Sequence, residues 1–246
     1  MAETTQSARR ATLVVGADSD MGAAIVAGLT GTVIAHFLTA PEKLDALESA
    51  DRALVRVRGD LSSADGVRAF VAEVAALDFE IDKIVHLPCL PAVPTKFRNF
   101  DEARFEKEMN VAFLSAALVC REFVPKMAKR RFGRVVFMLT SYIIGVPPRF
   151  LTSYVAVKCA LMGLMRSLAT EYADKGVTVN GVAPSMTETK FLADLADLTV
   201  EMSAKNNPLG RNARPADIAP TVLHLLGDDN AFTSGAVIPI TAATQF

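Results

Sequence analysis

Apolar and polar positions alternate in blocks along this chain, and the blocks predict strands and helices in turn. Short runs rich in β-branched residues predict seven strands, in TLVVGA, TVIAHFL, ALVRVRGDL, IDKIVHLP, GRVVFMLTS, VTVNGVAP and GAVIPIT. Amphipathic spacing predicts helices between them, in MGAAIVAGL, PEKLDALESA, SADGVRAFVAEVAAL and RPADIAPTVLHLLGD, and over about 101–130 and 152–175. This alternation is typical of a parallel sheet covered on both faces, so we expect one doubly wound, Rossmann-type α/β domain over residues 11–246.

Composition changes this picture little. The 246 residues are 51% hydrophobic and 22% charged, with a net charge of -1, which gives no reason to expect a nucleic-acid or membrane partner. Residues 1–10 form a polar tail without the apolar core of a signal peptide, and no apolar run is long enough to span a membrane, so we expect a cytoplasmic protein. Cys89, Cys120 and Cys159 lack metal-ligand spacing, so we expect no metal site and reduced, buried thiols.

Four polar residues form the candidate catalytic group. Tyr154 and Lys158 lie four residues apart on a predicted helix, so they share one face of it. Ser141 lies thirteen residues before Tyr154, at the end of a predicted strand, and Asn110 lies inside the preceding long helix. A tyrosine and a lysine on one helix face can also be simple packing, with the lysine reaching toward solvent.

In these residues the chain resembles the short-chain dehydrogenase/reductase family, and within it the 3-oxoacyl thioester reductases. The segments GRVVFMLTS, YVAVKCALMGLMRSLATEYADKGVTVNGVAP and NPLGRNARPADIAPTVLHLL match the family in order and spacing. The resemblance implies hydride transfer between NAD or NADP and a hydroxyacyl or oxoacyl thioester. It also implies that Tyr154 moves the proton, that Lys158 lowers the pKa of Tyr154 and holds the nicotinamide ribose, that Ser141 hydrogen-bonds the substrate oxygen, and that Asn110 kinks its helix and holds a water.

The resemblance also implies a cofactor site with unusual residues. The family's turn TGxxxGxG is VGADSDMG here, so Asp20 replaces the middle glycine. A carboxylate at about 4 Å from a phosphate costs roughly 1 kcal/mol in water and about 4 kcal/mol at an effective dielectric constant of 20. The residues that the resemblance assigns to the cofactor are Gly16, Ser19, Met21 and Gly22 in the turn, Asp60 for adenine, Lys158 for ribose and Thr189 for carboxamide.

Two further segments depart from the family at the same ligand. His86, Leu87, Pro88 and Cys89 replace the family's Asn-Asn-Ala-Gly, which walls the adenosine pocket. The end of the second strand, 38–40, offers neither an acid for the ribose hydroxyl nor an arginine for a 2′-phosphate. NAD or NADP is therefore expected to bind weakly or not at all. His86 itself could titrate near neutral pH, but a hydrogen-bonded structural role is favoured.

These features leave three functions open. The first is an NAD(P)-dependent oxidoreductase, active alone or within an oligomer. The second is a cofactor-free structural subunit that supports an active homologue in a heteromeric dehydrogenase. The third, a cofactor-independent lyase as in the halohydrin dehalogenases, is disfavoured because those enzymes use Ser-Tyr-Arg and this chain has Lys158.

Two segments carry expectations about substrate and assembly. Residues 189–205 are expected to form an amphipathic lid over the substrate, with Phe191, Leu192, Leu195 and Leu198 facing either an acyl chain or the core. A stripe of small residues on the helix near 152–175 permits close helix contact, and the family assembles through such helices, so we expect a dimer or tetramer with itself or with a homologous subunit. The stripe consists of Ala156, Cys159, Ala160, Gly163 and Ser167.

Overall fold

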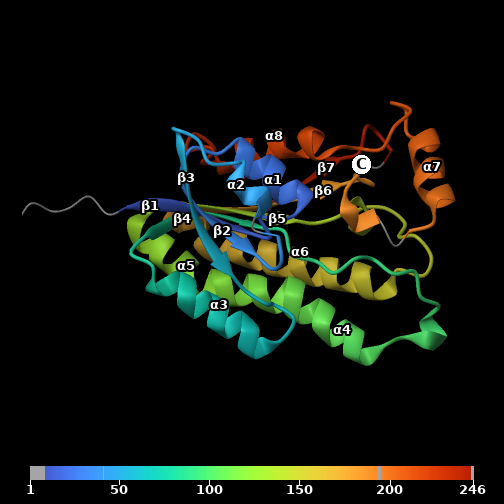
Figure 1. Ribbon diagram of the computed structural model, residues 1–246, viewed down its shortest axis with the longest axis horizontal. Coiled ribbons are helices and arrows are strands. Elements are labelled where there is room, and N and C mark those ends of the chain that lie inside the picture. Colours follow the sequence, from blue (N-terminus) through green and yellow to red (C-terminus); the bar gives the residue numbers. More distant parts are fainter. Residues whose placement is uncertain (1–8, 41, 193–194, 245–246) are drawn as a thin grey trace, which may run out of the picture.

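The computed structural model describes residues 9–40, 42–192 and 195–244, and it confirms the expected Rossmann-type α/β fold (Figure 1). All strand pairs are parallel, in the order β3-β2-β1-β4-β5-β6-β7. The strands are β1 (Arg10–Val15), β2 (Gly31–Phe37), β3 (Arg52–Arg58), β4 (Glu80–His86), β5 (Gly133–Met138), β6 (Val177–Pro184) and β7 (Val237–Ile240).

Helices cover both faces of the sheet, as Figure 1 shows. One face carries α3 (Ala64–Ala76), α4 (Glu102–Glu108), α5 (Ser115–Arg130) and α6 (Thr152–Tyr172). The other carries α1 (Asp20–Ala27), α2 (Glu42–Asp45) and α8 (Pro215–Leu226), while α7 (Asp197–Asn206) lies beyond the end of the sheet. Short 3-10 helices are η1 (Phe97–Asn99), η3 (Ser141–Ile143), η4 (Ala173–Lys175) and η5 (Lys190–Leu192), and η2 (Met109–Leu114) is a π-helix.

The sheet separates two apolar cores, one under each helix layer. Every residue of β5 is buried, as expected for a central parallel strand covered on both faces. Phe137 packs in the core beneath α3, α5 and α6, whereas its neighbour Val136 packs in the core beneath α1 and α8. The two cores therefore hold the carboxyl ends of β1 and β4 rigidly at the point where strand order reverses, which is where ligands bind in such sheets.

The structure corrects several details of the sequence-based expectations. The helix expected over PEKLDALESA is only α2, because hydrogen bonds in both directions between Ser49 and Arg52 turn the chain toward β3 (3.2 and 3.1 Å). Arg10 already belongs to β1, and the first eight residues of the expected tail lie outside the described residues. Cys159 is exposed and Cys89 is half-buried, so of the three thiols expected to be buried only Cys120 is. Within the described part of the chain, no helix combines the length and the hydropathy needed to cross a bilayer.

Candidate active site

Helix α6 brings Tyr154 and Lys158 to the carboxyl end of β5. Lys158 is 2% exposed, and its Nζ donates to the Met138 carbonyl oxygen at 2.7 Å. The same nitrogen lies 5.9 Å from the centre of the Tyr154 ring. A buried ammonium group requires a close acceptor, and the last carbonyl of β5 provides it. The expected pair of Tyr154 and Lys158 is therefore assembled on one helix face.

The Tyr154 phenol differs electrostatically from the expectation. Burial raises its pKa, and a side-chain hydrogen bond with Thr140 opposes that rise. We expected Lys158 to lower the pKa, but the cost of burying a phenolate is the larger effect. The phenol therefore carries its proton at neutral pH, as a proton donor requires.

Thr140, rather than Ser141, faces Tyr154. Ser141 is 2% exposed at the start of η3 and is not among the residues that line the cavity described below, whereas Thr140 is. The Thr140 hydroxyl accepts the backbone N–H of Tyr142 at 3.4 Å and hydrogen-bonds Tyr154. Sequence reasoning missed Thr140 because spacing from Tyr154 selected the second member of a Thr-Ser pair. The pair itself was the available signal, since either hydroxyl could face the site.

Asn110 lies in the π-helix η2, which interrupts the long helix expected over 101–130. Such single-turn π segments occur frequently at functional sites. The Asn110 side chain donates to the Ser62 carbonyl oxygen at 3.3 Å, which links η2 to the loop after β3. Asn110 does not line the cavity, although its neighbour Val111 does.

His86 has a structural environment. It is 1% exposed at the end of β4, and its Nε2 lies 2.7 Å from the Ser115 hydroxyl, which donates to the Val111 carbonyl at 2.5 Å. Ser115 therefore accepts from Nε2–H, and His86 is the neutral Nε2–H tautomer. Burial, and next the charge of Lys158, lower the pKa of His86 to about 3. These contacts agree with the structural role favoured from the sequence.

The turn between β1 and α1 has the backbone of a dinucleotide-binding turn. Gly16 has a φ of +82°, and a Cβ at Gly22 would lie 2.2 Å from the Gly16 carbonyl oxygen, so both positions require glycine. Ser19 caps α1 by accepting the Gly22 N–H at 2.9 Å and donates to the Gly16 carbonyl at 2.8 Å. Met21 lines the cavity beside this turn.

The two aspartates of this turn bind different segments that line the cavity. Asp18 Oδ2 accepts the backbone N–H groups of Leu38 and Thr39 at 3.1 and 3.4 Å, at the end of β2. Asp20 Oδ1 accepts from Lys43 Nζ at 3.0 Å, and its Oδ2 accepts the Lys190 backbone N–H at 2.8 Å. Asp18 thus places an acidic side chain near the end of β2. Residues 38–40, which follow β2 in the sequence, offer no acid of their own.

His36 is a second residue that sequence reasoning missed, because the pattern of TVIAHFL indicates a strand and gives no sign of contacts with other loops. Its Nδ1 accepts the Gly16 N–H at 2.9 Å, so the ring is neutral and Nε2 donates to the Gly59 carbonyl at 3.0 Å. Burial lowers its pKa, which favours this neutral form. His36 thereby joins the turn after β1 to the end of β3.

A single continuous cavity of about 590 Å³ connects these groups. One end lies at His36, Leu38 and Asp60, and the other lies at Thr140, Tyr154 and Lys158. Asp60 accepts the Ser62 N–H at 2.9 Å, which with the Ser62 side chain lowers the Asp60 pKa. The wall that replaces the family's Asn-Asn-Ala-Gly consists of Leu87, Pro88 and Cys89, continued by Leu90 to Ala92.

The segment after β6 closes the cavity near Tyr154. Thr189, Phe191, Leu192 and Leu195 line it, and the Phe191 ring centre lies 6.0 Å from that of Tyr154. Leu198, the fourth apolar residue of the expected lid, is 66% exposed on α7. It therefore faces neither the cavity nor the core. Residues 193–194, within the expected lid, lie outside the described residues.

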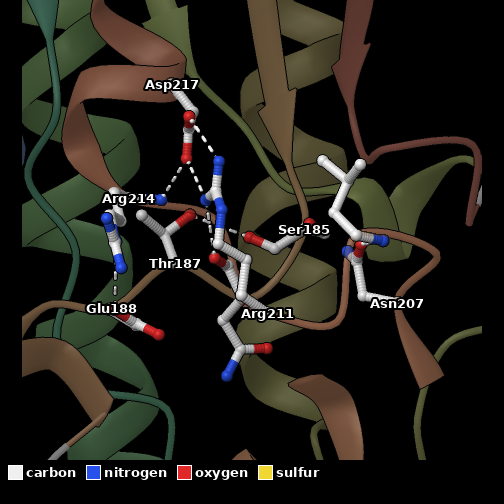
Figure 2. Close-up of polar contacts among 9 residues, drawn as sticks. Ser185, Thr187, Glu188, Asn207, Arg211, Arg214 and Asp217 are labelled. Carbon is white, nitrogen blue, oxygen red and sulfur yellow. Dashed lines mark hydrogen bonds and ion pairs between the residues drawn. The ribbon is translucent and has the colours of Figure 1, made fainter. Parts of the chain in front are cut away.

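Polar contacts anchor both ends of this segment, as Figure 2 shows. Arg211 binds the Asp217 carboxylate with two nitrogens, at 2.6 and 2.9 Å, and Arg214 N–H donates to the same group at 2.7 Å. These hydrogen bonds lower the Asp217 pKa to about 2. Glu188 pairs with Arg214 at 3.7 Å, so the chain before Lys190 is tied to the chain before α8.

Comparison with known proteins identifies the family. The family model described as enoyl-(acyl carrier protein) reductase matches residues 21–242. A cis-4-hydroxycyclohexanecarboxylate dehydrogenase of Sinomonas cyclohexanicum is 29% identical over 95% of each chain. An acetoacetyl-CoA reductase of Allochromatium vinosum is 31% identical over 74% of this chain and 73% of its own.

A solved structure extends the likeness to three dimensions. The crystal structure of a 3-oxoacyl (acyl-carrier-protein) reductase from Agrobacterium tumefaciens with NADP bound has a TM-score of 0.83 and 26% identity, and the match covers 95% of this chain and 93% of that one. The chain therefore belongs to the short-chain dehydrogenase/reductase family of oxidoreductases, in its 3-oxoacyl reductase-like branch.

Proposed function

We propose that this protein reduces an oxoacyl thioester to a hydroxyacyl thioester with NADH or NADPH. The observation that carries the proposal is the arrangement of Tyr154, Thr140 and Lys158 at one end of the cavity. A phenol whose pKa is raised holds its proton at neutral pH and can donate it to a carbonyl oxygen.

Each side chain near the reacting carbonyl group has a separate role. A bound nicotinamide cofactor supplies the hydride. Tyr154 donates the proton to the substrate oxygen, and the Thr140 hydroxyl, hydrogen-bonded to Tyr154, stabilises the developing negative charge. Lys158, fixed by the Met138 carbonyl, places a positive charge beside the same group. Ser141 and Asn110 lie outside the cavity lining, so we assign them to holding the backbone around it.

The residues of the cavity fit a dinucleotide at both ends. Gly16 and Gly22 form the tight turn, Ser19 and Met21 flank it, and α1 begins there with an N-terminus that favours a negative group. Asp60 lies at the adenosine end, and Lys158 and Thr189 lie at the nicotinamide end. Between these ends, the contacts of Asp20 with Lys43 and Lys190 cross the place of the pyrophosphate, so the fit requires these contacts to open.

The proposed substrate class rests on the apolar half of the cavity and on the relatives. Phe191, Leu192 and Leu195 give the Tyr154 end a lining suited to an acyl chain. The acetoacetyl-CoA reductase and the 3-oxoacyl (acyl-carrier-protein) reductase among the relatives act on oxoacyl groups by name. We therefore assign residues 189–205 as the substrate lid. Truncation by Phe191→Ala should raise KM for a long-chain oxoacyl thioester about tenfold, whereas Leu198→Ala on the exposed face of α7 should not change it.

A second function, a structural subunit that binds no cofactor, is favoured by one observation. By the resemblance of the turn, Asp20 stands at the place of a phosphate, and its carboxylate already accepts hydrogen bonds from two donors. Under this alternative, the chain would support a homologous, active subunit. Titration of the purified chain with NADH and NADPH distinguishes the two functions: saturable binding with turnover of acetoacetyl-CoA supports the oxidoreductase. Binding confined to a co-purified homologue would support the structural subunit.

We also propose that the chain forms a dimer or tetramer through α5 and α6. The small-residue stripe of α6 faces away from the sheet: Ala156, Cys159, Gly163 and Ser167 are exposed, and Ala160 is half-buried. A Cβ at Gly163 would meet no atom within 4 Å. Exposed small residues at helical spacing allow a second helix to approach closely.

A further inference from the structure

The carboxylate of Asp20 joins three separate parts of the chain. Asp20 is the first residue of α1; Lys43 lies in α2 and Lys190 begins η5. We refer to the contacts of Asp20 with Lys43 Nζ (3.0 Å) and with the Lys190 N–H (2.8 Å) as the Asp20 clasp. The side chains of Asp20 and Lys43 are each 29% exposed, so the pair is only partly screened by water.

The clasp lies across the middle of the cavity. Asp20, Lys43 and Lys190 all line it: Lys43 lies in α2, shortly after the end of β2, and Lys190 precedes Phe191, which lies against Tyr154. The N-terminus of α1 favours a negative group, which in this class of turn is normally a phosphate. Asp20 lies in the first turn of α1, so its carboxylate places a negative charge near that N-terminus, while its two donors come from Lys43 and Lys190.

The clasp also holds the lid. The contacts of Figure 2 tie Glu188 to Arg214, and the Glu188 N–H donates to the Ala213 carbonyl at 2.8 Å, so the chain is anchored just before Lys190. Beyond this anchor, the hydrogen bond from Lys190 to Asp20 links the lid to a turn 170 residues away. Phe191, the next residue, lies against Tyr154. Opening the clasp would therefore release the segment that covers the proton donor.

We propose that the Asp20 clasp is an internal substitute for the pyrophosphate of the cofactor. It holds the lid against the turn when the site is empty, and a dinucleotide binds by displacing the Asp20 carboxylate from Lys43 and from the Lys190 N–H. These two donors then serve the phosphates, so Lys43 is a phosphate-binding residue masked in the free protein. The cofactor half of this inference rests on the proposed function, whereas the link between Asp20 and the lid does not.

The contribution of Lys43 to dinucleotide affinity should depend on whether Asp20 is present. In the parent protein, Lys43 offsets the charge of Asp20, so Lys43→Met should weaken dinucleotide binding only about twofold. In the Asp20→Asn background, Lys43 is free for the phosphates, and its loss should weaken binding about tenfold or more. Asp20→Asn alone should tighten binding about 10- to 100-fold, because a like charge next to the phosphates is removed.

The experiment measures lid exchange and dinucleotide affinity in the same variants. Amide hydrogen exchange of 190–192 and 197–206 is followed without ligand, and Kd for NADH and NADPH is obtained by calorimetry. The variants are Asp20→Ala, which removes both contacts, and Asp20→Asn, which keeps an acceptor for the Lys190 N–H and guards against a folding defect. Asp18→Asn is the matched control, because Asp18 binds Leu38 and Thr39 and not the lid.

We expect Asp20→Ala to speed lid exchange about tenfold or more and to tighten dinucleotide binding, with Asp18→Asn leaving lid exchange unchanged. Unchanged lid exchange in Asp20→Ala overturns the proposal, as does a parent Kd that neither Asp20 variant improves. If dinucleotide affinity rises as expected while no oxoacyl thioester is turned over, the clasp stands and the proposed function fails. If the parent turns over substrate and the Asp20 variants match it in exchange and Kd, the clasp fails and the function stands.

Discussion

The Nζ of Lys158 lies 2.7 Å from the carbonyl oxygen of Met138, so the last carbonyl of β5 fixes the ammonium group beneath Tyr154. Lys158→Met should remove the charge and leave that carbonyl without its donor, and we expect turnover to fall about 100-fold or more. Steady-state kinetics check this, with Lys126→Met as a control because Lys126 pairs with Glu122 at an exposed site. Equal loss in both variants would contradict a specific role for Lys158.

Thr140 and Ser141 provide a direct contrast. Thr140→Val removes the hydroxyl that bonds Tyr154, and we expect kcat to fall about 10- to 100-fold. Thr140→Ser keeps the hydroxyl and should retain most activity. Ser141→Ala removes a hydroxyl outside the cavity lining and should leave kcat within about twofold. The reverse order, with Ser141→Ala inactive and Thr140→Val active, would return the role to Ser141.

His86 should make stability depend on pH. Its pKa in the folded protein, about 3, is below the ordinary histidine value of 6.5, so the unfolded chain binds the extra proton first. The contribution of neutral His86 to the free energy of unfolding is therefore fully present above about pH 6.5. It is lost as the pH falls toward 3, by up to about 1.4 kcal/mol per pH unit. His86→Asn, the residue type of the family at this position, should remove that slope. Urea unfolding of both proteins between about pH 4 and 7 measures it, and parallel curves would contradict the assignment.

The oligomer should depend on the exposed stripe of α6. Gly163→Arg places a large charged side chain where a single chain has open space, so we expect the fold to survive and the assembly to dissociate. Light scattering should give a multiple of the 26.3 kDa chain mass for the parent and a smaller multiple for the variant. A parent that is monomeric at micromolar concentration would exclude self-assembly, and an unchanged variant would place the interface elsewhere.

The sequence predicted the sheet well because apolar runs reflect burial on both faces, as β5 shows. It also predicted that Tyr154 and Lys158 share one helix face, since helical spacing alone puts them there, and both line the cavity. It did not distinguish Thr140 from Ser141, because which of two adjacent hydroxyls turns toward the cavity is decided by the start of η3. The length of α2 was likewise set by the local pairing of Ser49 with Arg52.

The contacts of the charged residues in the cofactor turn could not be predicted from the sequence, for a different reason. The sequence marked Asp20 as a group that would repel a phosphate, which follows from its charge and position. Its partner Lys190 lies 170 residues away and contributes a backbone N–H, which no pattern of side-chain types reveals. His36 was missed for a similar reason, since its contacts with Gly16 and Gly59 are made to backbone groups of two other loops.

The most direct measurement is the consumption of NADH or NADPH with acetoacetyl-CoA by the parent protein and by Tyr154→Phe. The phenol of Tyr154 is the proton donor in the proposed reaction, and the variant keeps the ring that packs against Phe191. We expect the parent to consume the reduced cofactor in proportion to thioester, and the variant to be slower by about 100-fold or more with its dinucleotide affinity unchanged. A variant as fast as the parent, or a parent inactive with oxoacyl thioesters of every chain length tested, would contradict the proposed function.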